Sequence, residues 1–299
     1  VDVWLAREID AVARRAGDSR LSMQAWAELS DLLEESRERM ASELRLAEIA
    51  ARLRSPSAAQ SRLSRALSID LRYPTAGEVL GRLRRAAGDP LSAAEAFEEG
   101  ARRAQSATRK ATLQALAGSL YEGAGDSERA AKAYFGAAKS DVKHADVLGR
   151  LMVLLPIHRR ALPLAELITQ RIAMGGEKSQ LADHHRMLAR VRLELGDATA
   201  AKRSLRTVAT LDPNRVDALE DLARVCLGSN DPRGAADALQ KIVITNSDTA
   251  TLRRAYIGLA NIFEAQRDVR RTKDVLRKMI ELFPNDSEAK QRLRLMEAR

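Results

Sequence analysis

The sequence predicts an all-α protein, a solenoid of about eight helix-turn-helix repeats that ends in a capping helix. The 299 residues include four Phe, four Tyr and two Trp, so the core must consist mainly of Ala and Leu, which suits closely packed helices. A Leu-Ala or Leu-Gly pair recurs about every 34 residues. A Gly-Asp or Asn-Asp pair then marks the turn between two helices of each repeat.

Small residues and prolines explain how each repeat is built. Apolar residues at three- and four-residue spacings mark two amphipathic helices per repeat, and neither helix can bury its apolar face alone. A small residue on each first helix lets the second helix approach closely. Pro213 and Pro284 are expected to end second helices. These small residues are Gly81, Gly118, Gly149, Ala189, Ala223 and Ala260.

The repeats differ in regularity along the chain. Residues 1–141 carry about four repeats, of which the first has Asp10 where a small residue is expected. Residues 142–181 form an irregular repeat, interrupted by prolines and stretched by Gly175-Gly176, which is a candidate joint between two halves. Residues 182–286 are expected to form three well-formed repeats, which start near 182, 216 and 253. Residues 287–299 are expected to form the capping helix.

The combination of Leu188-Ala189, Gly196-Asp197 and Leu211-Asp212-Pro213-Asn214, repeated with variations along nearly the whole chain, resembles the tetratricopeptide repeat family. Pentatricopeptide and Sel1-like repeats are the nearest competitors, and the prolines at repeat ends favour the tetratricopeptide type. The resemblance implies a right-handed α-solenoid whose first helices line a concave groove. It also implies a protein that binds other proteins.

In this family the residue after the small residue tends to point into the groove, and this predicts a binding site. Arginine at several of these positions would pair bidentately with carboxylates of an extended or helical segment. The alternative is a solvated helix face, because Glu78, Asp146 and Glu220 each precede one of these arginines by four residues. Arg190 has Arg186 at that spacing. The candidate groove residues are Arg82, Arg150, Arg186, Arg190, Arg224 and Asn261.

The sequence predicts no catalytic site, no metal site and no cofactor, and hence no enzyme. The four histidines lack a partner at a spacing that would place two ligands on one helix face, and His185 is expected to lie partly buried in the core. Cys226, the single cysteine, is expected to be a buried structural thiol.

The predicted function is that of a scaffold or adaptor that holds a peptide or small protein within a larger bacterial assembly. The alternative is a nucleic-acid-binding α-solenoid, because the net charge is +9 and the pI is near 10. Acidic residues close to most of the basic ones favour the scaffold. The absence of an initiating Met suggests a fragment of a longer protein, and a cytoplasmic location is preferred to a periplasmic one.

Overall fold

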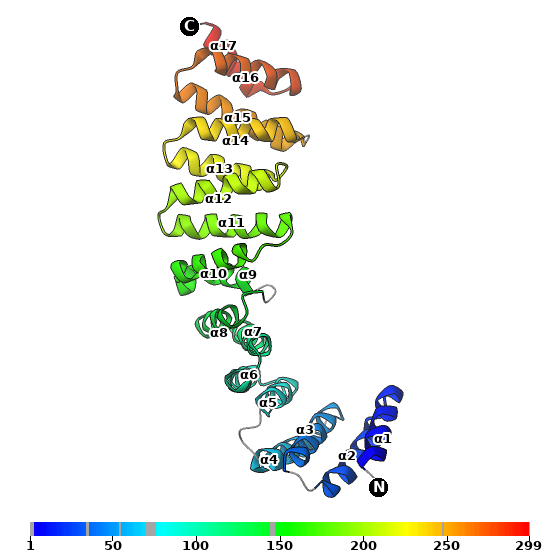
Figure 1. The fold of residues 1–299 in the computed structure, drawn as a ribbon. Helices are drawn as coiled ribbons and strands as arrows, with labels where there is room; N and C mark the ends of the chain where they lie inside the picture. Colours follow the sequence, from blue (N-terminus) through cyan, green and yellow to red (C-terminus); the bar gives the residue numbers. More distant parts are fainter. Residues whose placement is uncertain are drawn as a thin grey trace. The chain divides into compact units, whose positions relative to one another are not determined.

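The computed structural model describes residues 3–33, 36–53, 55–69, 76–143, 147–246 and 248–298. These residues form seventeen helices and no strand (Figure 1), which confirms the all-α solenoid fold. The chain divides into two compact units, Val1–Arg159 and Arg160–Arg299. The division falls inside the segment expected to be irregular.

The first unit contains four antiparallel helix pairs and one further helix, and each helix packs on its neighbour in the chain (Figure 1). The helices of this unit are α1 (Val3–Ala16), α2 (Ser19–Leu32), α3 (Ser36–Arg52), α4 (Pro56–Ile69), α5 (Ala76–Ala86), α6 (Pro90–Arg103), α7 (Ala107–Gly123), α8 (Ser127–Ser140) and α9 (Val147–His158).

The second unit begins with one helix, continues with three antiparallel pairs and ends with a short helix. Its helices are α10 (Ala161–Ala173), α11 (Lys178–Glu194), α12 (Ala198–Leu211), α13 (Val216–Gly228), α14 (Pro232–Thr245), α15 (Thr249–Ala265), α16 (Val269–Leu282) and α17 (Ser287–Glu297).

An aspartate caps the second helix of six pairs, as the repeated turn signal predicts. In each, the carboxylate accepts a hydrogen bond from a backbone amide in the first turn, which satisfies a donor that the helix leaves free. The residue just before the aspartate has a positive φ and reverses the chain. The capping residues are Asp18, Asp89, Asp126, Asp197, Asp231 and Asp268.

The turn between α9 and α10 keeps the residue with a positive φ but lacks the aspartate. Arg159 has φ 51°, and Arg160 occupies the capping position without a side-chain hydrogen bond to the helix. Pro156 lies within the last turn of α9 and Pro163 in the first turn of α10, so neither proline ends its helix early.

Glycine and alanine permit close helix packing at most of the predicted positions. A Cβ atom at Gly81 or Gly118 would lie 2.7 Å from a ring atom of Phe97 or Tyr134 on the following helix. Ala189, Ala223 and Ala260 are buried. The prediction is wrong for Gly149, where an added Cβ would meet nothing within 4 Å.

The last helix, α17, covers the apolar end of the pair α15–α16. Ala289 is buried against Tyr256, Leu276 and Met279, and Leu293 and Met296 pack on the same cluster, as their spacing predicts. Asp286 caps α17 through the amide of Ala289 and also accepts a 2.7 Å hydrogen bond from Arg253. This amide and the guanidinium hold the pKa of Asp286 below its usual value.

Candidate interaction surface

The six candidate groove residues lie on first helices and divide between the two units. Arg82 and Arg150 belong to α5 and α9 of the first unit. The second unit carries Arg186 and Arg190 on α11, Arg224 on α13 and Asn261 on α15. We call the surface formed by α11, α13 and α15 the first-helix face of the second unit.

Ion pairs link successive first helices across this face. The guanidinium of Arg186 on α11 donates to Asp217 and, at 2.9 Å, to Asp221 on α13. Arg224 pairs with the same Asp221 at 3.0 Å, so one carboxylate joins two of the candidate arginines. The prediction that Glu220 pairs with Arg224 is therefore wrong. Glu220 instead pairs with Arg254 on α15 at 3.2 Å.

Arg190 differs from its neighbours. Its side chain is exposed and makes no hydrogen bond or ion pair with any residue that the structure describes. Arg186 lies one helical turn before it, where a carboxylate would otherwise neutralise it. Arg190 is therefore available to an anionic group from outside the chain.

Asn261 ends this row of residues on α15. Its side-chain oxygen accepts a 2.8 Å hydrogen bond from Arg292 of α17, which also pairs with Glu264 at 2.8 Å. The side-chain oxygen of Asn261 is therefore already engaged in a hydrogen bond with the capping helix. Of the four candidates on this unit, Asn261 and Arg186 are the most constrained by internal contacts.

In the first unit, the candidate arginines are also paired with glutamates. Arg82 pairs with Glu78 on its own helix, as predicted, and with Glu48 on α3 at 3.2 Å. Arg150 pairs with Glu122 on α7 at 3.5 Å. Asp146, the expected partner of Arg150, lies outside the described residues.

Each unit contains an open cavity, and only that of the first unit is lined by a candidate residue. The cavity of the first unit, about 510 Å³, is lined by Arg82, Arg85 and Arg109 above Phe97 and Leu113. Arg85 and Arg109 were not predicted, because the candidates were taken from the position after the small residue, with only Arg186 added from one turn earlier.

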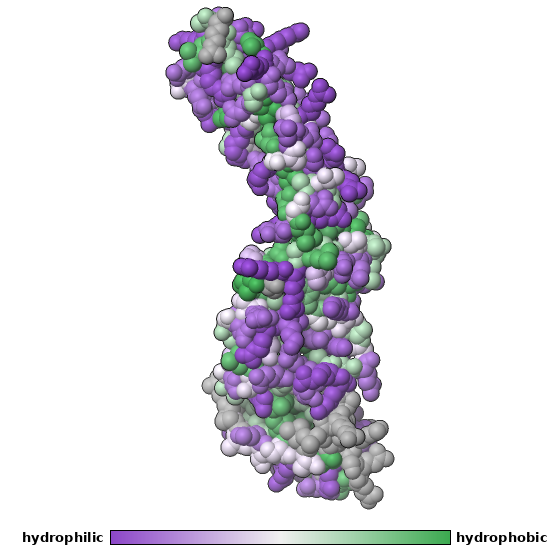
Figure 2. Space-filling view, turned by 90° about the vertical axis from the view of Figure 1, so that its left-hand side faces the viewer, coloured by the Kyte–Doolittle hydropathy of each residue, from purple (hydrophilic) through white to green (hydrophobic). Residues whose placement is uncertain are grey.

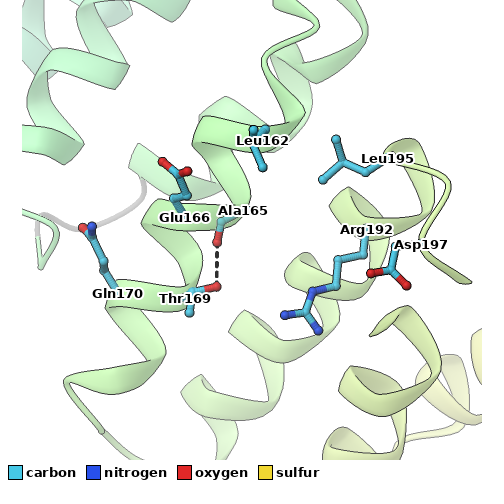
Figure 3. Close-up of a pocket in the computed structure, with 8 residues that line it drawn as sticks. All are labelled: Leu162, Ala165, Glu166, Thr169, Gln170, Arg192, Leu195 and Asp197. Carbon is cyan, nitrogen blue, oxygen red and sulfur yellow. Dashed lines mark hydrogen bonds between the residues drawn. The ribbon is translucent and has the colours of Figure 1, made fainter. Parts of the chain in front are cut away.

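The cavity of the second unit, about 610 Å³, lies between α10 and the end of α11. Figure 3 shows Leu162 and Leu195 on opposite sides of it. The Arg192 guanidinium at its edge donates to the Ala200 carbonyl and the Ser204 hydroxyl within the repeat. None of the six candidate residues lines this cavity, and the arrangement is that of a packing gap.

The histidines and acidic residues that the structure describes do not gather into a metal site. Within these ranges no group of three or more His, Cys, Asp or Glu residues could hold a metal ion. His184 and His185 are half-buried on α11, and burial lowers the pKa of both side chains. His144 and the side chain of His158 lie outside the part of the structure that is described. Among the described helices, none combines the length and apolarity needed to cross a membrane.

Cys226 is fully buried on α13, as predicted, and burial raises the pKa of its thiol. We expect it to react with a thiol reagent much more slowly in the folded protein than in urea. Cys226→Ser should lower the free energy of unfolding by about 1–3 kcal/mol, because a hydroxyl is buried in place of the thiol. Labelling rates and urea denaturation test this. Native labelling as fast as labelling in urea would contradict the buried position.

Known proteins share this architecture. Residues 192–256 match a family model described as Tetratricopeptide repeat. The fold is similar to a chain in the structure of Naa15/Naa10 bound to HypK-THB, with a TM-score of 0.62 and 14% identity over 87% of this chain and 39% of that one. It is also similar to the C-terminal part of a TPR repeat-containing protein from Cytophaga hutchinsonii, with a TM-score of 0.51 and 14% identity over 83% and 98% of the two chains. No curated protein matches the chain.

Proposed function

Because this chain carries tetratricopeptide repeats, we propose that it is an interaction scaffold that holds a polypeptide on the first-helix face of its second unit. The observation that carries the proposal is Arg190, an exposed arginine without an internal partner among the described residues, between the paired Arg186 and Arg224. An arginine in this position favours a carboxylate of the partner, which it can bind in a bidentate manner.

The charge arrangement supports a polypeptide partner over a nucleic acid. A phosphate backbone is bound by many unpaired cations at once. On this face, carboxylates of the chain pair with Arg186, Arg224 and Arg254, and each would have to be released before a phosphate could take its place. A partner with a few well-placed carboxylates needs one free arginine and leaves the ion pairs intact.

Site-specific cross-linking tests the proposal. We place a photo-activatable amino acid at position 190, and at position 203 as a matched control, since Arg203 is an exposed arginine of the second helix α12. In extracts of the source organism, position 190 should form protease-sensitive adducts that position 203 does not form. Nuclease-sensitive adducts at position 190, or the same adducts at both positions, would contradict the proposal.

Charge reversal of the arginines provides a quantitative prediction. Once the cross-linked partner is purified, Arg190→Glu should weaken binding by roughly tenfold or more, and by more than Arg224→Glu does. Arg224 already forms an ion pair with Asp221, so it contributes less to the affinity for the partner. Affinities at two salt concentrations, with thermal melts to confirm folding, test this order. Unchanged affinity of Arg190→Glu would place the binding surface elsewhere.

A further inference from the structure

Exposed aliphatic side chains recur at one position of three first helices. The residue four places after the small residue is Val153 on α9, Leu193 on α11 and Leu227 on α13. These side chains are 66%, 42% and 50% exposed. Figure 2 shows, for one face of the molecule, hydrophobic side chains exposed among the hydrophilic ones that predominate. Single exposed leucines are ordinary, but recurrence at one repeat position indicates a common role.

The same position is charged in the flanking repeats. It is Arg85 on α5, Glu122 on α7 and Glu264 on α15. Glu122 accepts a hydrogen bond from Tyr134 at 2.8 Å, and Glu264 pairs with Arg292, so the chain itself occupies these two carboxylates. The aliphatic residues are thus restricted to a segment of the repeat array and are not a general feature of the packing.

Each aliphatic residue lies next to a candidate arginine. Leu193 follows Arg190 by three residues, and Leu227 follows Arg224 by three, so each pair shares one helix face a single turn apart. The ion pairs from Arg186 to Asp217 and Asp221 join α11 to α13 at this surface. The second unit therefore presents two leucines beside two arginines, of which Arg190 has no internal partner among the described residues.

We propose that this surface, Arg190, Leu193, Arg224 and Leu227, binds an acidic amphipathic segment of a protein partner. An aliphatic side chain of the segment covers Leu193 and Leu227, and a carboxylate next to it pairs with Arg190. The positive charge of the surface favours a carboxylate. A purely polar polyanion would leave the two leucines without an apolar contact and is therefore disfavoured. This inference rests on the proposed scaffold function and adds the chemistry of the partner segment. The first unit carries a similar pair, Arg150 and Val153, on α9.

Fluorescence anisotropy with defined probes tests this proposal on the full chain. The probe is a labelled peptide with leucine and glutamate on one helical face. Two comparison peptides replace its glutamates by glutamine or its leucines by serine, and labelled oligo-deoxythymidine represents a phosphate ligand. Only the peptide with both leucine and glutamate should bind saturably, and added salt should weaken its binding.

Substitutions then separate the apolar and ionic contributions. Leu193→Gln, Leu227→Gln and Arg190→Gln should each weaken peptide binding roughly tenfold, about 1.4 kcal/mol. Glutamine is a good helix former, so the exposed helix positions should tolerate it. The matched controls are Ile244→Gln, an aliphatic residue 81% exposed on the second helix α14, and Arg203→Gln on α12. Both controls should bind like the parent.

Four results would overturn the proposal. They are the absence of saturable peptide binding, equal binding of the peptide without leucine, oligonucleotide binding that depends on Arg190 but not on the leucines, and self-association that Leu193→Gln abolishes. The last would mean that a second copy of the chain covers this surface. If any of these occurs while position 190 still cross-links to a polypeptide, the scaffold function stands and the partner chemistry is wrong.

Discussion

Replacing Gly77 by alanine is expected to lower the free energy of unfolding of the first unit by about 2–3 kcal/mol. A Cβ atom at this position would lie 2.5 Å from the backbone nitrogen of Gly100 and 2.8 Å from the carbonyl oxygen of Ala96. Both are backbone atoms of α6, so no side-chain rotation can relieve the overlap and the two helices must move apart. Urea denaturation followed by circular dichroism measures the change.

Gly149→Ala is the matched control for this substitution. Gly149 is also a helical glycine of the first unit, but its added Cβ would meet nothing within 4 Å. Alanine loses less conformational entropy on folding than glycine does, so the free energy of unfolding of this variant should rise by roughly 0.5–1 kcal/mol. Equal effects of the two substitutions would show that helix propensity, and not the contact between α5 and α6, decides the stability at these positions.

Deleting residues 287–299 should have the second large effect, and it should be local. Loss of α17 exposes Tyr256, Leu276 and Met279, which we expect to destabilise α15 and α16 on the order of 3 kcal/mol. Amide hydrogen exchange in these helices should accelerate roughly a hundredfold, while exchange in α11 and α12 changes little, because each repeat contacts only its neighbours.

Asp286→Asn provides the comparison for the deletion. Asparagine can still cap α17 but lacks the charge that pairs with Arg253. Hydrogen exchange in α15 and α16 should therefore accelerate clearly less in this variant than in the deletion. If the deletion accelerated exchange uniformly along the second unit, or not at all, α17 would not act as a local cap.

Local turn chemistry explains why the sequence predicts the repeats well. A residue that tolerates a positive φ followed by Asp, as in Gly196-Asp197, defines both a chain reversal and a helix start within two residues. The starts of first helices carry a less regular signal. Asp248 caps α15, whereas Glu177 and Arg215 precede α11 and α13 without a side-chain hydrogen bond to the helix. The helix α13 begins at Val216, where its repeat was expected to start, whereas α11 and α15 begin at Lys178 and Thr249, before the expected repeat starts near 182 and 253. The prediction for Gly149 failed because sequence periodicity does not show whether an added Cβ would meet a neighbouring atom.

The candidate surface was less predictable, because its ion pairs join residues about one repeat apart. The four-residue spacing within one helix predicts an ion pair between Glu220 and Arg224, whereas Glu220 pairs with Arg254 of the next first helix. Aligning charges at the repeat spacing would have found this pair. The exposure of Leu193 and Leu227 could not be derived from their spacing, since leucines on a first helix ordinarily belong to the core.

The ion pair between Glu220 and Arg254 also has a consequence for duplication of its own repeat. If the repeat containing α13 and α14 were duplicated in tandem, Glu220 of the first copy would face Asp217 of the second, in the place where Arg254 now lies. Two carboxylates would oppose each other where the present chain has an attractive pair. The junction between α13 and α15 therefore fits its present successor and would be weakened by a copy of its own repeat.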